Sequence, residues 1–281
     1  MSEWIGLLGA VGLLLVGIVV YYPGRVSRGA HAGFARRVLS KVSEVTVYFW
    51  IIKVLCTTVG ETFADFLNVD LGLGLTVTTY VMGAALAVAL VAQFRLDRYV
   101  PGVYWLAVVL ISIVGTLITD NFGVPIWIST IVFSVALAIT FSAWYASEGT
   151  LSIHTIFTRR REAFYWLAIL FTFALGTAAG DLVSEGYGFG YWRSGIHFAL
   201  VIGAVALAYF YGKANAVLAF WIAYIMTRPL GASLGDLVSQ RHAAGGLGTV
   251  WTSALFLITI LALVVFLSLT RTDRIESTEN A

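Results

Sequence analysis

Four acidic residues recur along the chain, and each of them ends a long apolar segment. Glycine or threonine stands directly before each acid, and a small residue lies five positions before it. Successive acids are 55 to 61 residues apart, which is the kind of spacing that an internal repeat produces. The four acids that share this register are Glu61, Asp120, Asp181 and Asp236.

Carboxylates gathered at one level of a helical bundle could bind a small cation. Other oxygen-bearing side chains lie about one helical turn from the acids, and oxygen is the ligand atom that Mg²⁺, Ca²⁺ and Mn²⁺ prefer. No histidine shares the register, which argues against a zinc or copper site. We therefore expect the four acids to form a metal or other small-cation site, like the acidic rings of cation-selective pores. The supporting residues are Thr57, Thr116, Thr177, Ser233, Asp65 and Glu185.

A simpler interpretation is that each acid is a solvated helix end at a membrane surface. A carboxylate at a helix C-terminus meets the negative end of the helix dipole, so this placement does not by itself stabilise the helix. The sequence leaves both interpretations open.

Two basic residues inside the apolar segments, Lys53 and Arg228, form a second candidate group. Each stands eight positions before the acid of its repeat. A charged side chain at such a depth is costly in a membrane and usually faces a cavity or a partner. Pro229 directly follows Arg228 and is expected to bend its helix. Two roles stay open: counter-ions that gate the acidic ring, or a static salt bridge between repeats, with Asp181 or Glu61 as the partner.

The composition places these residues on membrane-spanning helices. Of the 281 residues, 59% are hydrophobic and 11% are charged, outside the range of soluble globular proteins. The apolar segments reach the roughly 20 residues that cross a bilayer as a helix. We expect an all-α polytopic membrane protein with four parallel two-helix repeats in a pseudo-fourfold bundle, plus one N-terminal helix at Trp4–Tyr22. The expected pairs are 45–66 with 73–94, 101–119 with 125–147, 162–183 with 191–211, and 215–238 with 247–270.

Three segments follow from this pattern: an N-terminal transmembrane helix and basic linker (1–40), the four-repeat transmembrane domain (41–270) and a polar cytoplasmic tail (271–281). The first helix lacks a basic start and a cleavage site, so we expect a retained anchor. The single cysteine, Cys56, excludes a disulfide within one chain. A net charge of +2 gives no indication of a nucleic-acid partner.

Lysine and arginine placement predicts the orientation. Of the 17 basic residues, 13 fall on one face of the predicted bundle, and the loops on that face should be cytoplasmic. The chain is then a multi-pass protein of the cytoplasmic (inner) membrane, with its N-terminus outside and its C-terminus in the cytoplasm. The acids lie near the outer face.

Two further patterns concern packing. An aromatic residue and a tryptophan stand together near the start of each repeat's first helix, and we interpret these pairs as an interfacial belt. The pairs are Phe49-Trp50, Tyr104-Trp105, Tyr165-Trp166 and Phe220-Trp221. Gly176 with Gly180, and Gly231 with Gly235, form Gly-x-x-x-Gly motifs, which predict close packing among the first helices.

The chain resembles a bacterial family of uncharacterised integral membrane proteins made of four tandem two-helix repeats with a recurring tryptophan. The resemblance runs from about Lys41 to Leu269. It implies the fold and the membrane location, and it brings no substrate or activity. It is carried by Glu44-Val45-Thr46, Phe49-Trp50-Ile51-Ile52-Lys53-Val54-Leu55, Thr57-Thr58-Val59-Gly60-Glu61, Gly176-Thr177-Ala178-Ala179-Gly180-Asp181 and Thr227-Arg228-Pro229-Leu230-Gly231-Ala232.

The leading hypothesis is a small-cation transporter or channel, with a divalent metal ion as one candidate substrate and no cofactor predicted. Lys53 and Arg228 would tune or gate it. The alternative is a non-transporting scaffold or accessory subunit that recruits a protein partner through its N-terminal helix and otherwise contacts only lipid. An enzyme is not expected, since the sequence has no nucleophile–base pair, no paired metal histidines and no nucleotide-binding loop.

Overall fold

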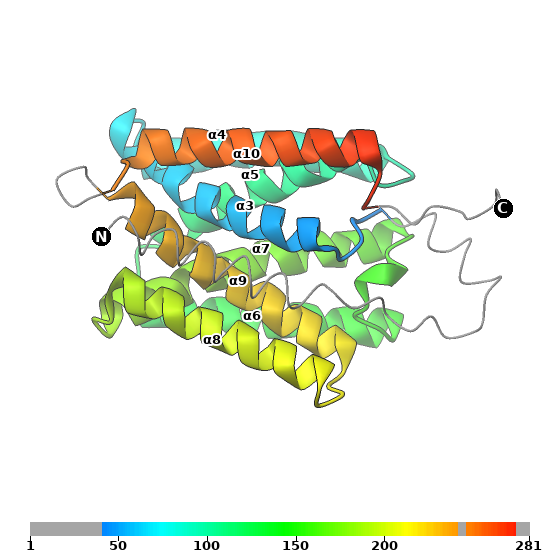
Figure 1. Cartoon of the computed structure of the whole chain (residues 1–281). Coiled ribbons are helices and arrows are strands. Elements are labelled where there is room, and N and C mark those ends of the chain that lie inside the picture. Colours follow the sequence, from blue (N-terminus) through cyan, green and yellow to red (C-terminus); the bar gives the residue numbers. More distant parts are fainter. Residues whose placement is uncertain (1–40, 241–245, 274–281) are drawn as a thin grey trace.

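Helices are the only regular secondary structure in the residues that the structure describes, 41–240 and 246–273 (Figure 1). The structure is a computed structural model. Eight of the described helices are long and apolar enough to cross a membrane, which confirms the predicted all-helical, multi-pass protein of two-helix repeats. The predicted helix Trp4–Tyr22, its linker and the tail beyond residue 273 lie outside the described residues.

All eight helices expected in the repeats are present, and their ends lie within three residues of the predicted ones. The first helices of the repeats are α3 (Val47–Asp65), α5 (Pro101–Asp120), α7 (Arg159–Asp181) and α9 (Ala216–Ser239). The second helices are α4 (Leu75–Arg95), α6 (Ile126–Glu148), α8 (Gly190–Phe210) and α10 (Thr249–Thr270). The short elements are the π-helical turns η1 (Phe66–Asp70) and η3 (Leu182–Gly186) and the 3₁₀ turn η2 (Ile153–Thr155).

The four first helices form an inner ring, and the four second helices lie around it. Within the ring, α3 and α7 each pack against α5 and α9. Each outer helix packs mainly on the inner helix of the following repeat: α4 on α5, α6 on α7 and α8 on α9. The last outer helix, α10, packs on α3 and closes the circle (Figure 1).

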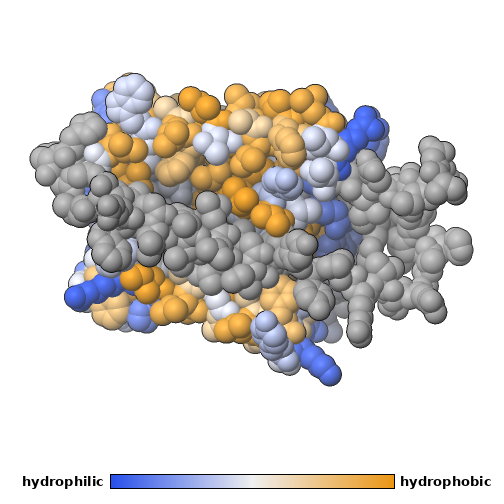
Figure 2. Space-filling model, viewed as in Figure 1, coloured by the Kyte–Doolittle hydropathy of each residue, from blue (hydrophilic) through white to orange (hydrophobic). Residues whose placement is uncertain are grey.

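The outer helices are predominantly apolar, and most of their residues are at least partly exposed. Figure 2 shows apolar side chains along the length of the bundle, with hydrophilic residues toward its two ends. A helix that is apolar all round is expected where lipid is the solvent. The inner helices are mostly buried, so the polar residues on them face protein rather than lipid.

One glycine on each inner helix lets that helix approach the next one. A side-chain carbon added at any of these four glycines would overlap its neighbour. In every repeat the glycine follows the tryptophan by ten residues, and the residue it meets follows its own tryptophan by seven. The close packing predicted for the small residues is thus confirmed, and it repeats around the ring. The contacts are Gly60 with Ser112, Gly115 with Phe173, Gly176 with Arg228 and Gly231 with Thr57.

This register corrects the alignment of the first repeat. Asp120 follows its tryptophan by fifteen residues, and the residue fifteen positions after Trp50 is Asp65, not Glu61. Glu61 therefore lies one helical turn deeper in the bundle, level with Thr116. The sequence-based match of Glu61 to the acids of the other repeats was wrong by one turn, because it was made on the acids rather than on the tryptophan and the glycine.

Each inner helix begins at a residue that favours helix starts, and this start fixes how far along the bundle axis the later residues of the helix lie. Threonine or asparagine side chains accept hydrogen bonds from backbone N–H groups of the first turn in three of them, and proline starts the fourth. The residues are Thr46, Thr158, Asn215 and Pro101. We call the end of the bundle where the inner helices begin the aromatic end, and the end where they stop the carboxylate end.

Candidate functional site

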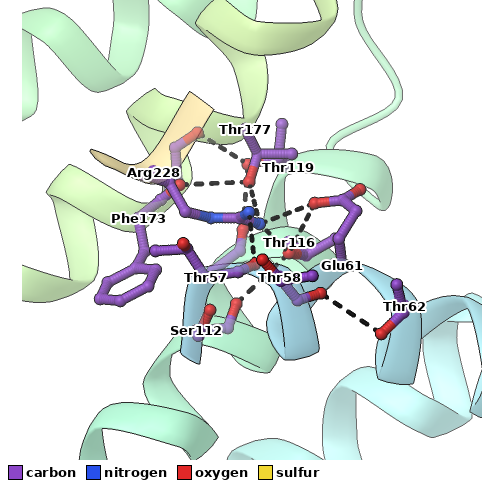
Figure 3. Close-up of polar contacts among 12 residues, drawn as sticks. Thr57, Thr58, Glu61, Thr62, Ser112, Thr116, Thr119, Phe173, Thr177 and Arg228 are labelled. Carbon is purple, nitrogen blue, oxygen red and sulfur yellow. Dashed lines mark hydrogen bonds and ion pairs between the residues drawn. The ribbon is translucent and has the colours of Figure 1, made fainter. Parts of the chain in front are cut away.

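Arg228 lies fully buried in the middle of the inner ring and contacts all four inner helices (Figure 3). Its Nη2 donates to Oε2 of Glu61 at 2.8 Å, to the hydroxyl of Thr177 at 2.7 Å and to the hydroxyl of Thr116. Its Nη1 donates to the carbonyl oxygen of Thr57 at 3.1 Å. One guanidinium on α9 is thus bonded to α3, α5 and α7.

The ion pair between Arg228 and Glu61 is the salt bridge between repeats that the sequence left open. Glu61 is 8% exposed, and its Oε2 also accepts a hydrogen bond from Thr116 at 3.4 Å. Removing one partner of a buried pair leaves the other charge without compensation, which is strongly destabilising. The pair therefore fixes the inner helices to one another at this level and fills the space between them.

Four aspartates, one from each inner helix, end the ring on the carboxylate side of this pair. All are at least partly exposed, and their charges lie within electrostatic range of Glu61. No group of three acidic, histidine or cysteine side chains in the described part of the chain is close enough to hold a metal ion. The acids thus gather at one end without forming a direct coordination shell. They are Asp65, Asp120, Asp181 and Asp236.

The predicted supporting residues divide into two groups. Thr116 and Thr177 bond to Arg228, as described above, and so does the backbone of Thr57, whose hydroxyl donates to the Thr227 carbonyl at 3.3 Å. These groups serve the guanidinium rather than an ion at the aspartates. Ser233 is buried against Gly195 of α8.

Glu185 remains at the carboxylate end, on the turn η3 that continues α7. It is exposed and accepts a hydrogen bond from the Tyr191 hydroxyl at 3.0 Å. Its charge lies within range of Asp120 and Asp181. Turns of the π type occur often at functional sites, and here they follow Asp65 and Asp181 directly.

Lys53 lies one layer from Arg228 toward the aromatic end and is 1% exposed. Its Nζ has no hydrogen-bond partner among the described residues. It sits 3.9 Å from the ring centroid of Phe173 and 4.3 Å from that of Tyr224. Two ring faces, rather than a carboxylate, therefore stabilise any positive charge on this side chain.

The aromatic–tryptophan pairs are buried inside the aromatic end, so the predicted interfacial belt is wrong. Each of the eight side chains, apart from the half-buried Phe220, is at most 4% exposed. The hydroxyls of Tyr104 and Tyr165 lie 2.5 Å apart, and the Trp221 indole donates to the Leu151 carbonyl at 3.0 Å. The rings pack on one another across the helices and fill the space between them at this end.

A buried polar network at the aromatic end was not expected from the sequence. Nζ of Lys41 lies 2.8 Å from Oε2 of Glu162, and Gln93 donates to Oε1 of Glu162 and to the Lys41 carbonyl, both at 3.2 Å. The network joins the segment before α3 to α4 and α7. The sequence signal that could have revealed this network is Glu162, an acid in an otherwise basic first turn.

Comparison with known proteins agrees with the repeat architecture. Four segments of the chain match the model of a repeat of unknown function (DUF347), at residues 48–99, 103–150, 164–214 and 219–273. Each segment spans one inner helix and the outer helix after it. Neither a search of curated proteins nor one of solved structures found a match. Because the matched segments cover most of the chain, this protein belongs to the DUF347 repeat family, with four copies of the repeat.

Proposed function

We propose that this protein transports a small cation across a membrane, with the carboxylate end as the place where the cation binds. The observation that carries the proposal is the position of four aspartates, one from each inner helix, next to the buried pair of Arg228 and Glu61. Carboxylates at helix C-termini repel the helix dipoles and one another. A cation among them would remove that cost, so the arrangement favours cation binding.

The closed axis favours a transporter over a permanently open channel. Arg228 on α9 is bonded to the three other inner helices, and aromatic rings fill the space beyond it. Passage of an ion would require these groups to move. Pro229 offers a place for such movement, because α9 lacks one backbone hydrogen bond there. A cation that competes with Arg228 for Glu61 would provide the driving interaction.

The absence of a three-ligand group among the described residues supports a cation that is held through water or by long-range attraction. The proposed substrate is therefore a small monovalent or divalent cation, and not a divalent metal ion alone. We also propose that the aromatic end faces the cytoplasm, because most of the lysines and arginines of the described loops lie there. The site would then face the outside of the cytoplasmic membrane.

The test is the melting temperature of the purified protein against Mg²⁺, Ca²⁺, Mn²⁺, K⁺ and tetramethylammonium, followed by flux into proteoliposomes. A cation that binds only the folded state raises the melting temperature. The variants are Asp181→Asn and Asp65→Asn, and the matched control is Asp97→Asn, an exposed acid at the opposite end. We expect a selective shift in wild type and Asp97→Asn that is lost in the other two. No shift and no flux with any of these cations would favour the scaffold.

A further inference from the structure

Within the described residues, the buried amine of Lys53 contacts two aromatic rings and makes no hydrogen bond. Arg228 has a carboxylate partner and three other hydrogen bonds, whereas Nζ of Lys53 has no hydrogen bond within the described residues. Both cations lie over the same ring, since Cζ of Arg228 is 5.9 Å from the centroid of Phe173 and Nζ of Lys53 is 3.9 Å from it. The middle of the bundle thus holds two cationic groups and one buried carboxylate, Glu61.

Lysine and arginine differ in how readily they lose a proton when they are buried. A guanidinium stays charged at any physiological pH, whereas a buried amine can give up its proton and become neutral. Lys53 and Arg228 are within electrostatic range, so loss of the Glu61 charge to a competing cation would increase the repulsion on Lys53. Arg228, whose charge is permanent, therefore has a carboxylate partner, whereas Lys53, which can lose its charge, has none among the described residues.

Hydroxyl groups lie between Lys53 and the aromatic end. Tyr224 is at the level of Lys53, and the bonded pair Tyr104 and Tyr165 lies one turn farther along. Tyr99 follows, with its ring 5.4 Å from that of Tyr104. Burial and the negative charge of Asp273 raise the pKa of the Tyr99 hydroxyl, which keeps it protonated. Within the described residues the Tyr224 hydroxyl makes no hydrogen bond, whereas Tyr104 and Tyr165 are bonded to each other. Hydroxyls accept one proton while donating another, so a relay through this series would need water between Lys53 and the bonded pair.

No acid in the described part of the chain forms a hydrogen bond with Nζ of Lys53. The outer helix α10, which covers the far side of α3, has no charged or titratable residue. The Lys53 amine is therefore a basic group at the centre of the ring without a carboxylate bonded to it. The charged or titratable groups around Lys53 and its aromatic neighbours are Cys56 of α3, Tyr104 of α5, Tyr165 of α7, and Tyr224 and Arg228 of α9.

We propose that Lys53 is a proton-binding site coupled to the cation site, so that a cation arriving at the carboxylate end drives a proton out toward the aromatic end. This inference rests on the proposed cation transport and makes it a cation–proton exchange. In the step, an N–H bond of the ammonium breaks and the nitrogen keeps the electron pair. A water molecule takes the proton from the amine, each tyrosine hydroxyl on the way accepts one proton and donates another, and water at the aromatic end accepts the last.

The experiment counts protons released per cation bound. Mg²⁺, Mn²⁺ and K⁺ are each titrated into wild type and into Lys53→Met by calorimetry, in buffers with different heats of ionisation. Wild type should release about one proton more per bound cation than Lys53→Met, because binding and proton release are linked at one amine. Lys53→Arg, which keeps the charge but holds its proton, should lose the same release and serves if the methionine variant does not fold.

The outcomes separate this inference from the proposed function. Equal proton release in wild type and both Lys53 variants would assign the protons to the aspartates and overturn the role of Lys53. Cation binding without proton release would overturn it too, while leaving cation transport in place. If wild type binds and transports none of the cations, the proposed function itself fails.

A second variant tests the relay. Tyr165→Phe removes the hydroxyl that lies 2.5 Å from that of Tyr104. In proteoliposomes with a trapped pH dye, it should slow the appearance of protons without changing the number released at equilibrium. Tyr145→Phe, at an exposed position near the same end, is the matched control and should match wild type. Equal rates in all three proteins would overturn the hydroxyl path.

Discussion

The two ends of the inner ring differ in their side chains: one end is aromatic and buried, and the other is acidic and partly exposed. At the aromatic end, tryptophan and tyrosine rings are buried against one another, and the charged pair Lys41 and Glu162 is buried with them. At the carboxylate end, four aspartates are partly exposed, and turns of irregular helix follow two of them. The pair Arg228 and Glu61 stands between. The difference indicates that the aromatic end and the pair stabilise the ring, so that removing a charge at the carboxylate end should cost less stability.

The largest expected effect comes from comparing Glu61 with Asp120, an acid that lies one helical turn nearer the carboxylate end. Glu61→Gln leaves the Arg228 guanidinium buried without its counter-charge, and breaking such a pair costs about 3–5 kcal/mol. Asp120→Asn changes an exposed side chain and should alter stability by less than about 0.5 kcal/mol. Reversible unfolding in mixed detergent measures both.

The double variant Glu61→Gln with Arg228→Met is the control. It removes both charges, so it should be less destabilised than the sum of its two single variants. Additive losses would show that the pair contributes nothing beyond its separate side chains.

A smaller effect is expected from two glycines on neighbouring helices. Gly115→Ala places a carbon 2.8 Å from Cβ of Phe173 and 3.3 Å from the backbone of Ala174, so α5 and α7 must separate, at a cost of about 1–3 kcal/mol. In Gly180→Ala, nearer the carboxylate end, the new carbon lies 3.4 Å from Pro229, an ordinary contact. That change should be neutral or stabilising, because alanine favours helix. Similar melting temperatures for the two variants would contradict the tighter packing inferred around the Arg228 level.

The smallest expected effect is at the aromatic end. Tyr104→Phe removes one interhelical hydrogen bond and keeps the ring, and such bonds in membrane proteins contribute about 0.6 kcal/mol on average. The melting temperature should fall slightly, with Tyr145→Phe as the unchanged control. A loss as large as that of Glu61→Gln would mean that hydroxyls, rather than ring packing, hold this end together.

Length and hydropathy were enough to place the eight helices, because a span through lipid requires a long apolar run with few exceptions. The repeat was also visible, since Trp50 and Gly60 have counterparts at the same spacing in every copy. The level of Glu61 was missed because Glu61 precedes the true counterpart, Asp65, by only one helical turn. The sequence pattern around the acids does not distinguish the two, and the glycine contacts do.

The burial of the tryptophan pairs was missed for another reason. A tryptophan near a helix start fits either an interface or a core, and only the packing of several helices decides between them. The interaction of Lys53 with two rings also depends on residues more than a hundred positions away, Phe173 and Tyr224, which no local pattern connects.

The closed circle of repeats has a consequence for how this protein could have arisen from identical parts. A tetramer of separate two-helix chains would be forced to place the same side chain four times at the level of Arg228, and four guanidiniums facing one axis would repel one another. Joining the copies in one polypeptide removes that constraint. The positions there hold threonine, serine, phenylalanine and a single arginine, at Thr57, Ser112, Phe173 and Arg228. Fusion of the copies thus permits a single arginine among the four equivalent positions at this level, where a symmetric assembly allows only none or four.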